Sequence, residues 1–478
     1  MEEPAKFAAN PKQWRGSRDT EPANRILDEE WVDSRNVDSR IGGRRAGVFQ
    51  RAIVGAPGGI YGISPYRRPD GSLHRAVVTS EGKLYDDTTL VLDGISTTNF
   101  PLLVPGHGSL FIVNGMDAPR WRDPADGVWK FLQNVPTDWK PGYATFHPLS
   151  KRLFFAPTAA GMDWYAWSNA DFTGANITFS GPGGGAEYVG GNREPITSIM
   201  HGLGDDLSIY TTDHVYQIRG LDPSNWRPRF VSGDLGSSAG RATVILGHGN
   251  FFAHYSGCYL VNAIGAVTFP PLTFPRQNAW DEMVKANETT FTRSHATWNA
   301  QEQTVYLFVP TDSSLLLGQL WKFYLPDGSI SISDVASYCS CYYPPRFTYV
   351  GLANGVIADL QDGDNDLGVP FTGWVRSKIY GEVDRIFEWG KQEKCVMLFK
   401  PLNEGIVRVQ PIIYPQHERG GPVEGTMQSI DLDREGDAVR ATIFLPPVQG
   451  WGIQFHIEGE DAWRWEGFSV EAVRQDLE

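Results

Sequence analysis

The hydrophobic residues of this chain fall in short runs. Most runs are four to seven residues long, rich in Val, Ile, Tyr, Phe and Trp, and bounded by Gly, Asp, Asn or Ser. β-Branched and aromatic residues between turn-forming residues are typical of β-strands. Residues 276–286 differ, because their apolar positions follow a helical spacing directly after Pro275. The pattern therefore predicts an all-β fold with one isolated helix.

Seven apolar hairpins recur along the chain, each with a strand, a polar turn and a second strand that carries aromatic residues. They begin at Val77, Phe111, Leu153, Leu207, Phe251, Tyr306 and Tyr349. Successive starts lie 34 to 55 residues apart, and units of about 40–50 residues are typical of β-propeller blades. Stacking blades around an axis buries both faces of each sheet. We predict a propeller of six or seven blades; the scatter of the intervals leaves a pair of β-sandwiches as the alternative.

Three regions follow from this repeat. We predict an N-terminal arm with the first strands at 1–50, the propeller at 51–368, and a C-terminal β-domain resembling a sandwich at 369–478. The last region has longer strands, and its apolar residues alternate at Ile453, Phe455 and Ile457. Such alternation is typical of half-buried antiparallel strands. About 100 residues is an ordinary size for a separate domain.

The composition is that of a folded, acidic protein. The 478 residues include 42 basic and 56 acidic ones, a net charge of −14, and 41% are hydrophobic, which excludes a disordered chain. No window offers about 18 consecutive apolar residues, so we expect no membrane insertion. The acidic start has no apolar signal region, and four cysteines give no disulfide framework. We therefore expect synthesis in a reducing cytoplasm.

No catalytic motif lies in the context that it requires. Residues 236–240 read Gly-Ser-Ser-Ala-Gly, the pattern of a hydrolase nucleophile elbow. The β-branched residues at 243–245 favour a strand, whereas the elbow opens a helix. Walker A, HExxH and helix-opening GxGxxG motifs are missing. We predict no enzyme activity, no catalytic or metal-binding residue and no cofactor.

Four aspartates cluster at the predicted end of the propeller: Asp359, Asp362, Asp364 and Asp366. An EF-hand loop needs Gly at its sixth position and a bidentate carboxylate at its twelfth. Counted from Asp362, those positions hold Leu367 and Gly373. We predict a solvated turn between domains, and a structural cation of another kind near Asp362, Asp364 and Asp366 stays open.

Tryptophans offer an alternative function. Trp164 and Trp167 lie three residues apart, and Trp463 and Trp465 lie near the end of the chain. Exposed, they would form a stacking platform for sugars, whereas strand aromatics more often belong to cores or subunit interfaces. A propeller that binds or cleaves glycans is therefore the alternative function.

Arginines near the N-terminus are the candidate interface or DNA-facing residues. They are Arg40, Arg44, Arg45 and Arg51. Guanidinium groups bind phosphate, although most surface charge is only solvated.

Five segments resemble short-tailed bacteriophage tail proteins. At 23–49, Trp31 precedes an Asn-Val pair by five residues and leads into a charged, Gly-containing turn, as at the opening of those proteins. The segments 152–179, 194–220 and 236–261 are similar to their successive blades, and 450–473 is similar to their closing β-domain. The resemblance is to the tail-hub or nozzle class, also described as packaged-DNA stabilisation proteins.

This resemblance implies a structural virion protein of the phage tail, assembled in the bacterial host cytoplasm. It implies a homo-hexamer below the portal-adaptor ring, in contact with tail fibre, spike or needle proteins. Double-stranded DNA would pass through its lumen without sequence specificity, and the class supplies no catalytic residues. A negative net charge suits this role, because each basic side chain on phosphate would add affinity and retain the duplex. With this resemblance, the glycan alternative becomes a tail-associated propeller that binds or cleaves host glycans as a receptor. A cytoplasmic scaffold for host proteins is a third possibility.

Overall fold

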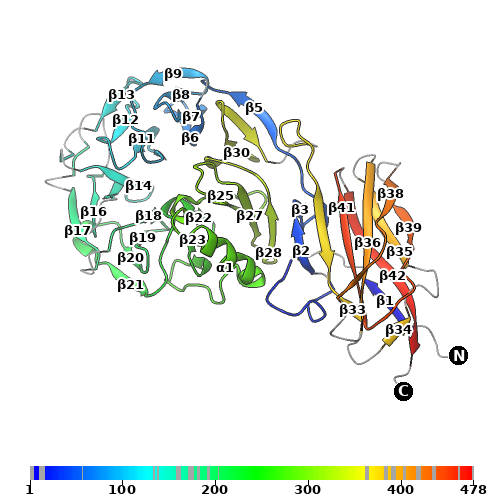
Figure 1. The fold of residues 1–478 in the computed structure, drawn as a ribbon. Helices are drawn as coiled ribbons and strands as arrows, with labels where there is room; N and C mark the ends of the chain where they lie inside the picture. The colour runs from blue at the N-terminus through cyan, green and yellow to red at the C-terminus, as the bar shows by residue number, and fades with distance from the viewer. Residues whose placement is uncertain are drawn as a thin grey trace.

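The chain folds as an all-β protein with two parts, a ring of sheets and a separate β-domain (Figure 1). The computed structural model describes residues 5–9, 15, 17–28, 30–55, 58–132, 135–136, 139–157, 163–170, 177–179, 183–190, 194–202, 204–360, 365–381, 386–388, 395–401, 405–415, 421–432, 438–460 and 463–475. The predicted all-β class and the propeller are confirmed.

Seven antiparallel sheets of the described residues form the ring, and we call them blades 1 to 7 in chain order. Blades 1 to 4 take four consecutive strands each. Blade 1 has β6 (Ile60–Arg67), β7 (Leu73–Thr79), β8 (Leu84–Asp86) and β9 (Thr89–Leu92), and blade 2 has β10 (Leu102–Gly106), β11 (Ser109–Val113), β12 (Arg120–Arg122) and β13 (Trp129–Phe131). Blade 3 has β14 (Pro141–His147), β15 (Arg152–Pro157), β16 (Trp164–Trp167) and β17 (Gly185–Tyr188), and blade 4 has β18 (Ser198–His201), β19 (Asp206–Tyr210), β20 (Val215–Arg219) and β21 (Arg229–Ser232).

Blade 6 follows the same plan, whereas blades 5 and 7 differ from it in one respect each. Blade 5 has three strands, β22 (Val244–Leu246), β23 (Gly249–His254) and β24 (Gly257–Val261). Blade 6 has β25 (His295–Asn299), β26 (Thr304–Val309), β27 (Gln319–Tyr324) and β28 (Ser329–Ser333). Blade 7 has β29 (Cys339–Tyr343), β30 (Phe347–Gly351) and β31 (Val356–Asp359), and its outer strand is β5 (Phe49–Ile53) from the other end of the chain.

The first strands of the blades form a closed inner ring. Each contacts the first strand of the next blade, and β29 returns to β6. The seven hairpins predicted from the sequence are the second and third strands of the seven blades. These strands give the repeated sequence pattern because both of their faces pack against neighbouring blades, where β-branched and aromatic side chains fill the space.

The C-terminal β-domain is a sandwich of two sheets. One sheet contains β1 (Ala5–Ala9), β3 (Val37–Asp38), β4 (Gly43–Arg44), β34 (Ile386–Glu388), β35 (Cys395–Pro401), β39 (Val439–Ile443), β40 (Gln449–Gly450) and β42 (Trp463–Gln475). The other contains β2 (Trp31–Arg35), β32 (Gly373–Ser377), β33 (Tyr380–Gly381), β36 (Gly405–Tyr414), β37 (Val423–Glu424), β38 (Gln428–Leu432) and β41 (Gly452–Gly459). Ile453, Phe455 and Ile457 are all buried in one core with Trp463 and Trp465, as the alternation predicts.

The helix lies where the sequence places it, beside blade 5. It is α1 (Gln277–Ala286), which buries Trp280 and Met283. The Trp280 ring packs edge-on against Trp321 of blade 6, with centroids 5.3 Å apart. Four 3-10 turns complete the described helical structure: η2 (Pro223–Asn225), η3 (Gly240–Ala242), η4 (Phe274–Arg276) and η5 (Phe291–Arg293).

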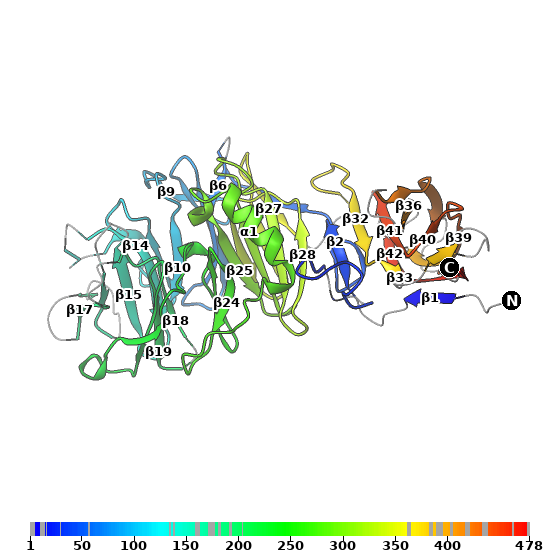
Figure 2. The same cartoon turned by 60° about the horizontal axis from the view of Figure 1, so that its bottom comes forward.

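The predicted arm at 1–50 is not a separate unit in the structure. Its strands β1, β3 and β4 pair with β42, and β2 pairs with β32, so they complete the C-terminal domain. Figure 2 shows β2 between the propeller and the rest of that domain, and β1, the first described strand, within the domain. The boundary near residue 50 also shifts, because β5 belongs to blade 7. Pairing between segments more than 300 residues apart leaves no local signal in the sequence.

The N-terminal segment also attaches the two parts to each other. Asn36 donates its backbone N–H to Ile332 at 2.9 Å, and its side-chain oxygen accepts from the Asp334 N–H at 2.8 Å. Ser39 bonds to the hydroxyl groups of Ser329 and Ser331. The outer strand of blade 6 therefore packs on β2 and β3.

Candidate functional site

A cavity of about 750 Å³ opens among the inner strands of the propeller. Its polar lining includes Asn99, Asn114, Arg241, Arg293 and His295. None of the described residues that line it is Asp or Glu, although the chain has 56 acidic residues. The size is within the usual range of about 300–1,000 Å³ for small-molecule sites.

Arg241 enters this cavity from η3, the turn that leads into blade 5. Its Nη2 donates to the carbonyl of Tyr338 at 2.8 Å, and its guanidinium lies 4.2 Å from the ring centroid of Phe100. Its Nη1 is buried and has no hydrogen-bond partner among the described residues. Burial lowers the pKa of Arg241 to about 10, because a charged group loses hydration in the interior. At neutral pH the side chain stays charged.

His295 begins β25 in blade 6 and is buried at 3% exposure. Its Nδ1 lies 3.0 Å from Ser340 Oγ, and its ring stacks on Phe308 with centroids 4.8 Å apart. Burial, and then the charge of Arg241, hold the pKa of His295 well below its usual range. The imidazole is therefore neutral at physiological pH, and its Nε2 makes no hydrogen bond to a described residue.

The two cysteines of the cavity carry no charge either. Cys339 and Cys341 are free and buried. Burial raises the pKa of Cys339 to about 12 and that of Cys341 further above its usual range. Reactive cysteines have a lowered pKa, because the thiolate is the nucleophile. The described cavity thus offers a cation and neutral polar groups in apolar surroundings, and no thiolate nucleophile.

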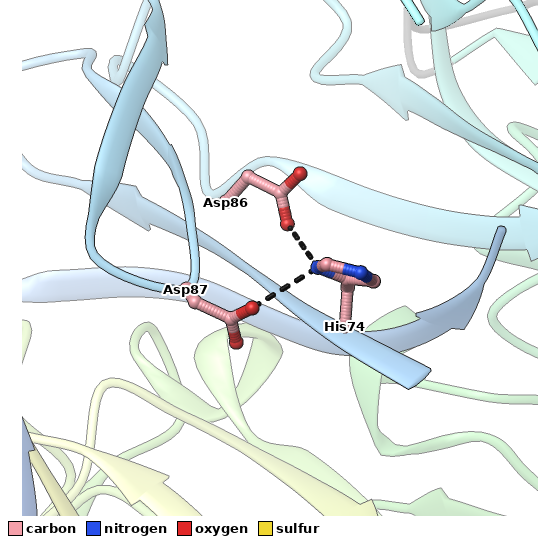
Figure 3. A group of neighbouring side chains, drawn as sticks. All are labelled: His74, Asp86 and Asp87. Carbon is pink, nitrogen blue, oxygen red and sulfur yellow. Dashed lines mark hydrogen bonds and ion pairs between the residues drawn. The ribbon is translucent and has the colours of Figure 1, made fainter. Parts of the chain in front are cut away.

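A second cluster lies in blade 1, where His74 stands between Asp86 and Asp87 (Figure 3). His74 Nδ1 lies 3.1 Å from Asp86 Oδ1 and 3.0 Å from Asp87 Oδ2. These three residue types can bind a metal ion. The other Asp86 oxygen, however, already accepts from Tyr66 and Arg68.

The pairing of a buried aspartate near the end of a third strand with a cationic side chain, as in Asp86 with Arg68, recurs in two other blades. Asp123 directly follows the third strand of blade 2 and pairs with Lys130 at 2.7 Å. Asp359 ends the third strand of blade 7, is fully buried, and pairs with Arg51 at 3.0 Å. A cation thus compensates each buried carboxylate at this position, which a buried charge requires. The recurrence indicates that Asp86 is a structural residue of the blade.

The first predicted interface residue, Arg40, binds to carboxylates of its own chain. Its Nη2 lies 2.5 Å from Asp38 Oδ2, and its Nη1 lies 3.0 Å from Glu302 Oε2 in blade 6. Burial by itself raises the pKa of Asp38, but Lys322 and Arg40 hold it well below its usual range. This buried ion group joins the N-terminal segment to the propeller.

Arg44 and Arg45 are both buried, and both contact the ring of Phe371. Their guanidinium groups lie 3.9 and 3.8 Å from the Phe371 ring centroid. Arg45 also forms a bidentate pair with Asp366 at 2.8 and 2.5 Å. In the folded chain Arg44 and Arg45 are inside, and Arg40 and Arg51 are paired with carboxylates. An acidic chain supplies such partners for its arginines. An interface or DNA-facing role for the set stays a prediction.

The structure also shows where the aspartate cluster and the elbow-like motif lie. Asp366 pairs with Arg45, whereas Asp362 and Asp364 lie outside the described residues. Ser237 and Ser238 of the elbow-like motif are buried, and the strand β22 follows them as predicted. Neither serine resembles an exposed nucleophile.

The tryptophans do not form the platform considered from the sequence. Trp463 and Trp465 are fully buried in the sandwich core. Trp164 packs on Trp139 with centroids 4.6 Å apart, and Trp167 packs edge-on against Trp226 at 5.2 Å. Stacking on a sugar requires a free aromatic face, so Trp463 and Trp465 are excluded from such a platform, whereas Trp164 and Trp167 are half-buried.

Sequence reasoning missed Arg241 and His295. Arg241 directly follows the rejected Gly-Ser motif and His295 follows Ser294, and no spacing links the two. They meet only because blades 5 and 6 are neighbours in the ring. A search for basic residues at the start of predicted first strands could have found His295.

Comparisons with known proteins return propellers at low identity. YCF48 from Cyanidioschyzon merolae is 11% identical, with a TM-score of 0.42, over 66% of this chain and 99% of that one. Virginiamycin B lyase from Staphylococcus aureus is 11% identical, with a TM-score of 0.44, over 66% and 99%. A chain of the mitotic checkpoint complex is 11% identical, with a TM-score of 0.42, over 69% and 97%. No family model and no curated protein matches.

Among the described residues, no helix is long and apolar enough to cross a membrane.

Proposed function

We propose that this protein is a structural subunit of the tail of a short-tailed bacteriophage. It forms a homo-hexameric hub or nozzle ring below the portal-adaptor ring, retains packaged DNA and allows its ejection. Tail fibre, spike or needle proteins are its other partners, and it carries out no catalytic step. The resemblance of segments 23–49, 152–179, 194–220, 236–261 and 450–473 to that class supports this role.

One surface feature carries the proposal. Five successive blades, from blade 7 through blades 1 to 4, present an exposed apolar side chain on the outer strand. This rim set is Phe49, Leu90, Phe131, Tyr188 and Phe230, with exposures between 48% and 68%. Each of their strands is the free edge of its sheet, and such edges are usually protected or paired. Repeated apolar edges suit lateral contacts with neighbouring subunits and tail proteins.

The charge and the cavity are consistent with DNA passing through the ring rather than through a propeller. A cavity of about 750 Å³ is the size of a small-molecule site, whereas a duplex needs a wide channel between subunits. Six copies of a chain at −14 would carry −84. That field repels phosphate and opposes retention by contact.

Native mass spectrometry of the purified protein, with cryo-electron microscopy of assembled tails, tests the proposal. We expect a six-copy ring. Phe131→Asp should lower the ring fraction at least ~10-fold, because a buried interface aromatic contributes about 2 kcal/mol or more. Phe269→Asp is the matched control, since Phe269 is 86% exposed after β24 and lies off the rim set.

Two results would contradict the proposal. A wild-type protein that stays monomeric at high concentration and forms no ring in tails would overturn the hub function. Equal loss of rings in both variants would overturn the role of the rim set. Thermal unfolding of each monomer separates lost assembly from lost folding.

A further inference from the structure

The central cavity is a positive site in an acidic protein. It is lined by Arg241, Arg293 and His295, and by no carboxylate of the described residues. Several other buried charges are paired within the chain, as Arg45 is with Asp366. The cavity has no such carboxylate among the described residues, and a charge in the interior without a counterion is costly.

Arg241 is the charge that lacks a counterion. It forms no ion pair with a described residue, and its Nη1 makes no hydrogen bond to one. Its contacts are one carbonyl oxygen, at 2.8 Å, and the face of Phe100. A guanidinium presents five N–H donors in a planar fork that matches a carboxylate. Most of that donor capacity is unused.

The remaining polar groups limit the ligand to a single negative charge. His295 is neutral, and its Nε2 is buried without a partner among the described residues. Arg293, half-buried like Arg241, donates its Nη1 to the carbonyls of Ser313 and Ser314. Since Arg241 instead keeps a buried Nη1 without a partner among the described residues, it is the cation that a monoanion would balance.

The walls of the cavity indicate an apolar body on this ligand. Its apolar lining includes Phe100, Leu102, Ile199, Met200 and Leu315. Apolar walls with a few convergent polar groups are typical of sites for small organic molecules. Inorganic ions would leave these walls in contact with water.

We propose that the central cavity binds a small monocarboxylate with an apolar body, and that Arg241 holds the carboxylate. Arg241 and His295 supply donors from blades 5 and 6, and the apolar lining contacts the body of the ligand. This site is independent of the proposed tail function.

Calorimetric titration of the wild-type full-length chain with benzoate tests the proposal. Benzyl alcohol is the neutral analogue of similar shape, and inorganic phosphate tests the anion without an apolar body. We expect benzoate to bind at least ~10-fold more tightly than either compound. Benzyl alcohol cannot form the charge-assisted pair with Arg241, and phosphate cannot make the apolar contact. No binding of benzoate, or equal binding of benzyl alcohol or phosphate, overturns the proposal.

Variants then locate the binding. Arg241→Gln should weaken benzoate at least ~10-fold, whereas Arg219→Gln, the same change on a side chain outside the cavity, should leave it unchanged. Without benzoate, Arg241→Gln should unfold at or above the wild-type temperature, because an uncompensated buried charge is removed. Unchanged binding by Arg241→Gln overturns the assignment. If that variant does not fold, Arg241→Lys, which keeps the charge and loses the fork, should bind with intermediate affinity, and wild-type affinity overturns it.

Discussion

Two histidines of the propeller show how burial acts at the scale of single residues. His147 ends β14 and His201 ends β18, and their rings contact edge to face with centroids 6.0 Å apart. Thr145 Oγ1 lies 3.1 Å from His201 Nδ1. Burial, with a smaller contribution from His147, lowers the pKa of His201 to about 4. Burial also lowers the pKa of His147.

These shifts predict a loss of stability in mild acid. The folded pKa of His201 lies below the usual 6.5, so the unfolded chain binds more protons between about pH 6.5 and 4. Stability should fall as pH drops through that window, by at most about 3 kcal/mol from this group. His201→Gln should reduce the slope, whereas His248→Gln, at an exposed site, should not. Urea unfolding at pH 7 and pH 4.5 measures both, and equal slopes would count against the assignment.

At the scale of elements, the strands from the N-terminal segment fit the C-terminal sheets closely. Gly43 lies in β4 opposite Arg464 of β42. A Cβ at Gly43 would stand 1.7 Å from the backbone oxygen of Trp463. The contact is with backbone, so no side-chain movement can relieve it.

Gly43→Ala should therefore destabilise the protein by roughly 2–3 kcal/mol, the usual cost of overpacking. Gly247→Ala is the control, because a Cβ there has nothing within 4 Å. Urea unfolding followed by tryptophan fluorescence compares the two variants. Equal stability would show that β4 does not sit against β42 in solution.

At the scale of the whole molecule, the two ends of the chain build one domain and close the ring. Trp31 and Val37 from the N-terminal segment belong to the sandwich core. β5 completes blade 7 along β31. Neither the propeller nor the C-terminal domain is complete without strands from the first 53 residues of the chain.

A fragment of residues 369–478 should thus fail to fold by itself, since burial of an aromatic such as Trp31 contributes about 3–5 kcal/mol. Residues 17–46 joined to its N-terminus through a flexible linker should restore a folded domain. Dispersion of the amide signals in two-dimensional NMR is the measurement. A dispersed spectrum from 369–478 alone would contradict this prediction.

The local patterns of the chain were sufficient for the strands and the ring. The hairpins from Val77 to Tyr349, the helix near 277–286 and the alternation at Ile453 and Phe455 are read from neighbouring residues, and the structure has them in place. Strand propensity and amphipathic period depend on residues a few positions apart, so one sequence is enough to predict them.

Only the tertiary structure decided which distant residues meet. It placed Arg45 against Asp366, Trp465 in the sandwich core, and Arg241 beside His295 in the central cavity. These contacts join residues from different blades or from opposite ends of the chain. Charge pairing and burial act through space, and the register between distant strands that sets them has no signal in the local pattern.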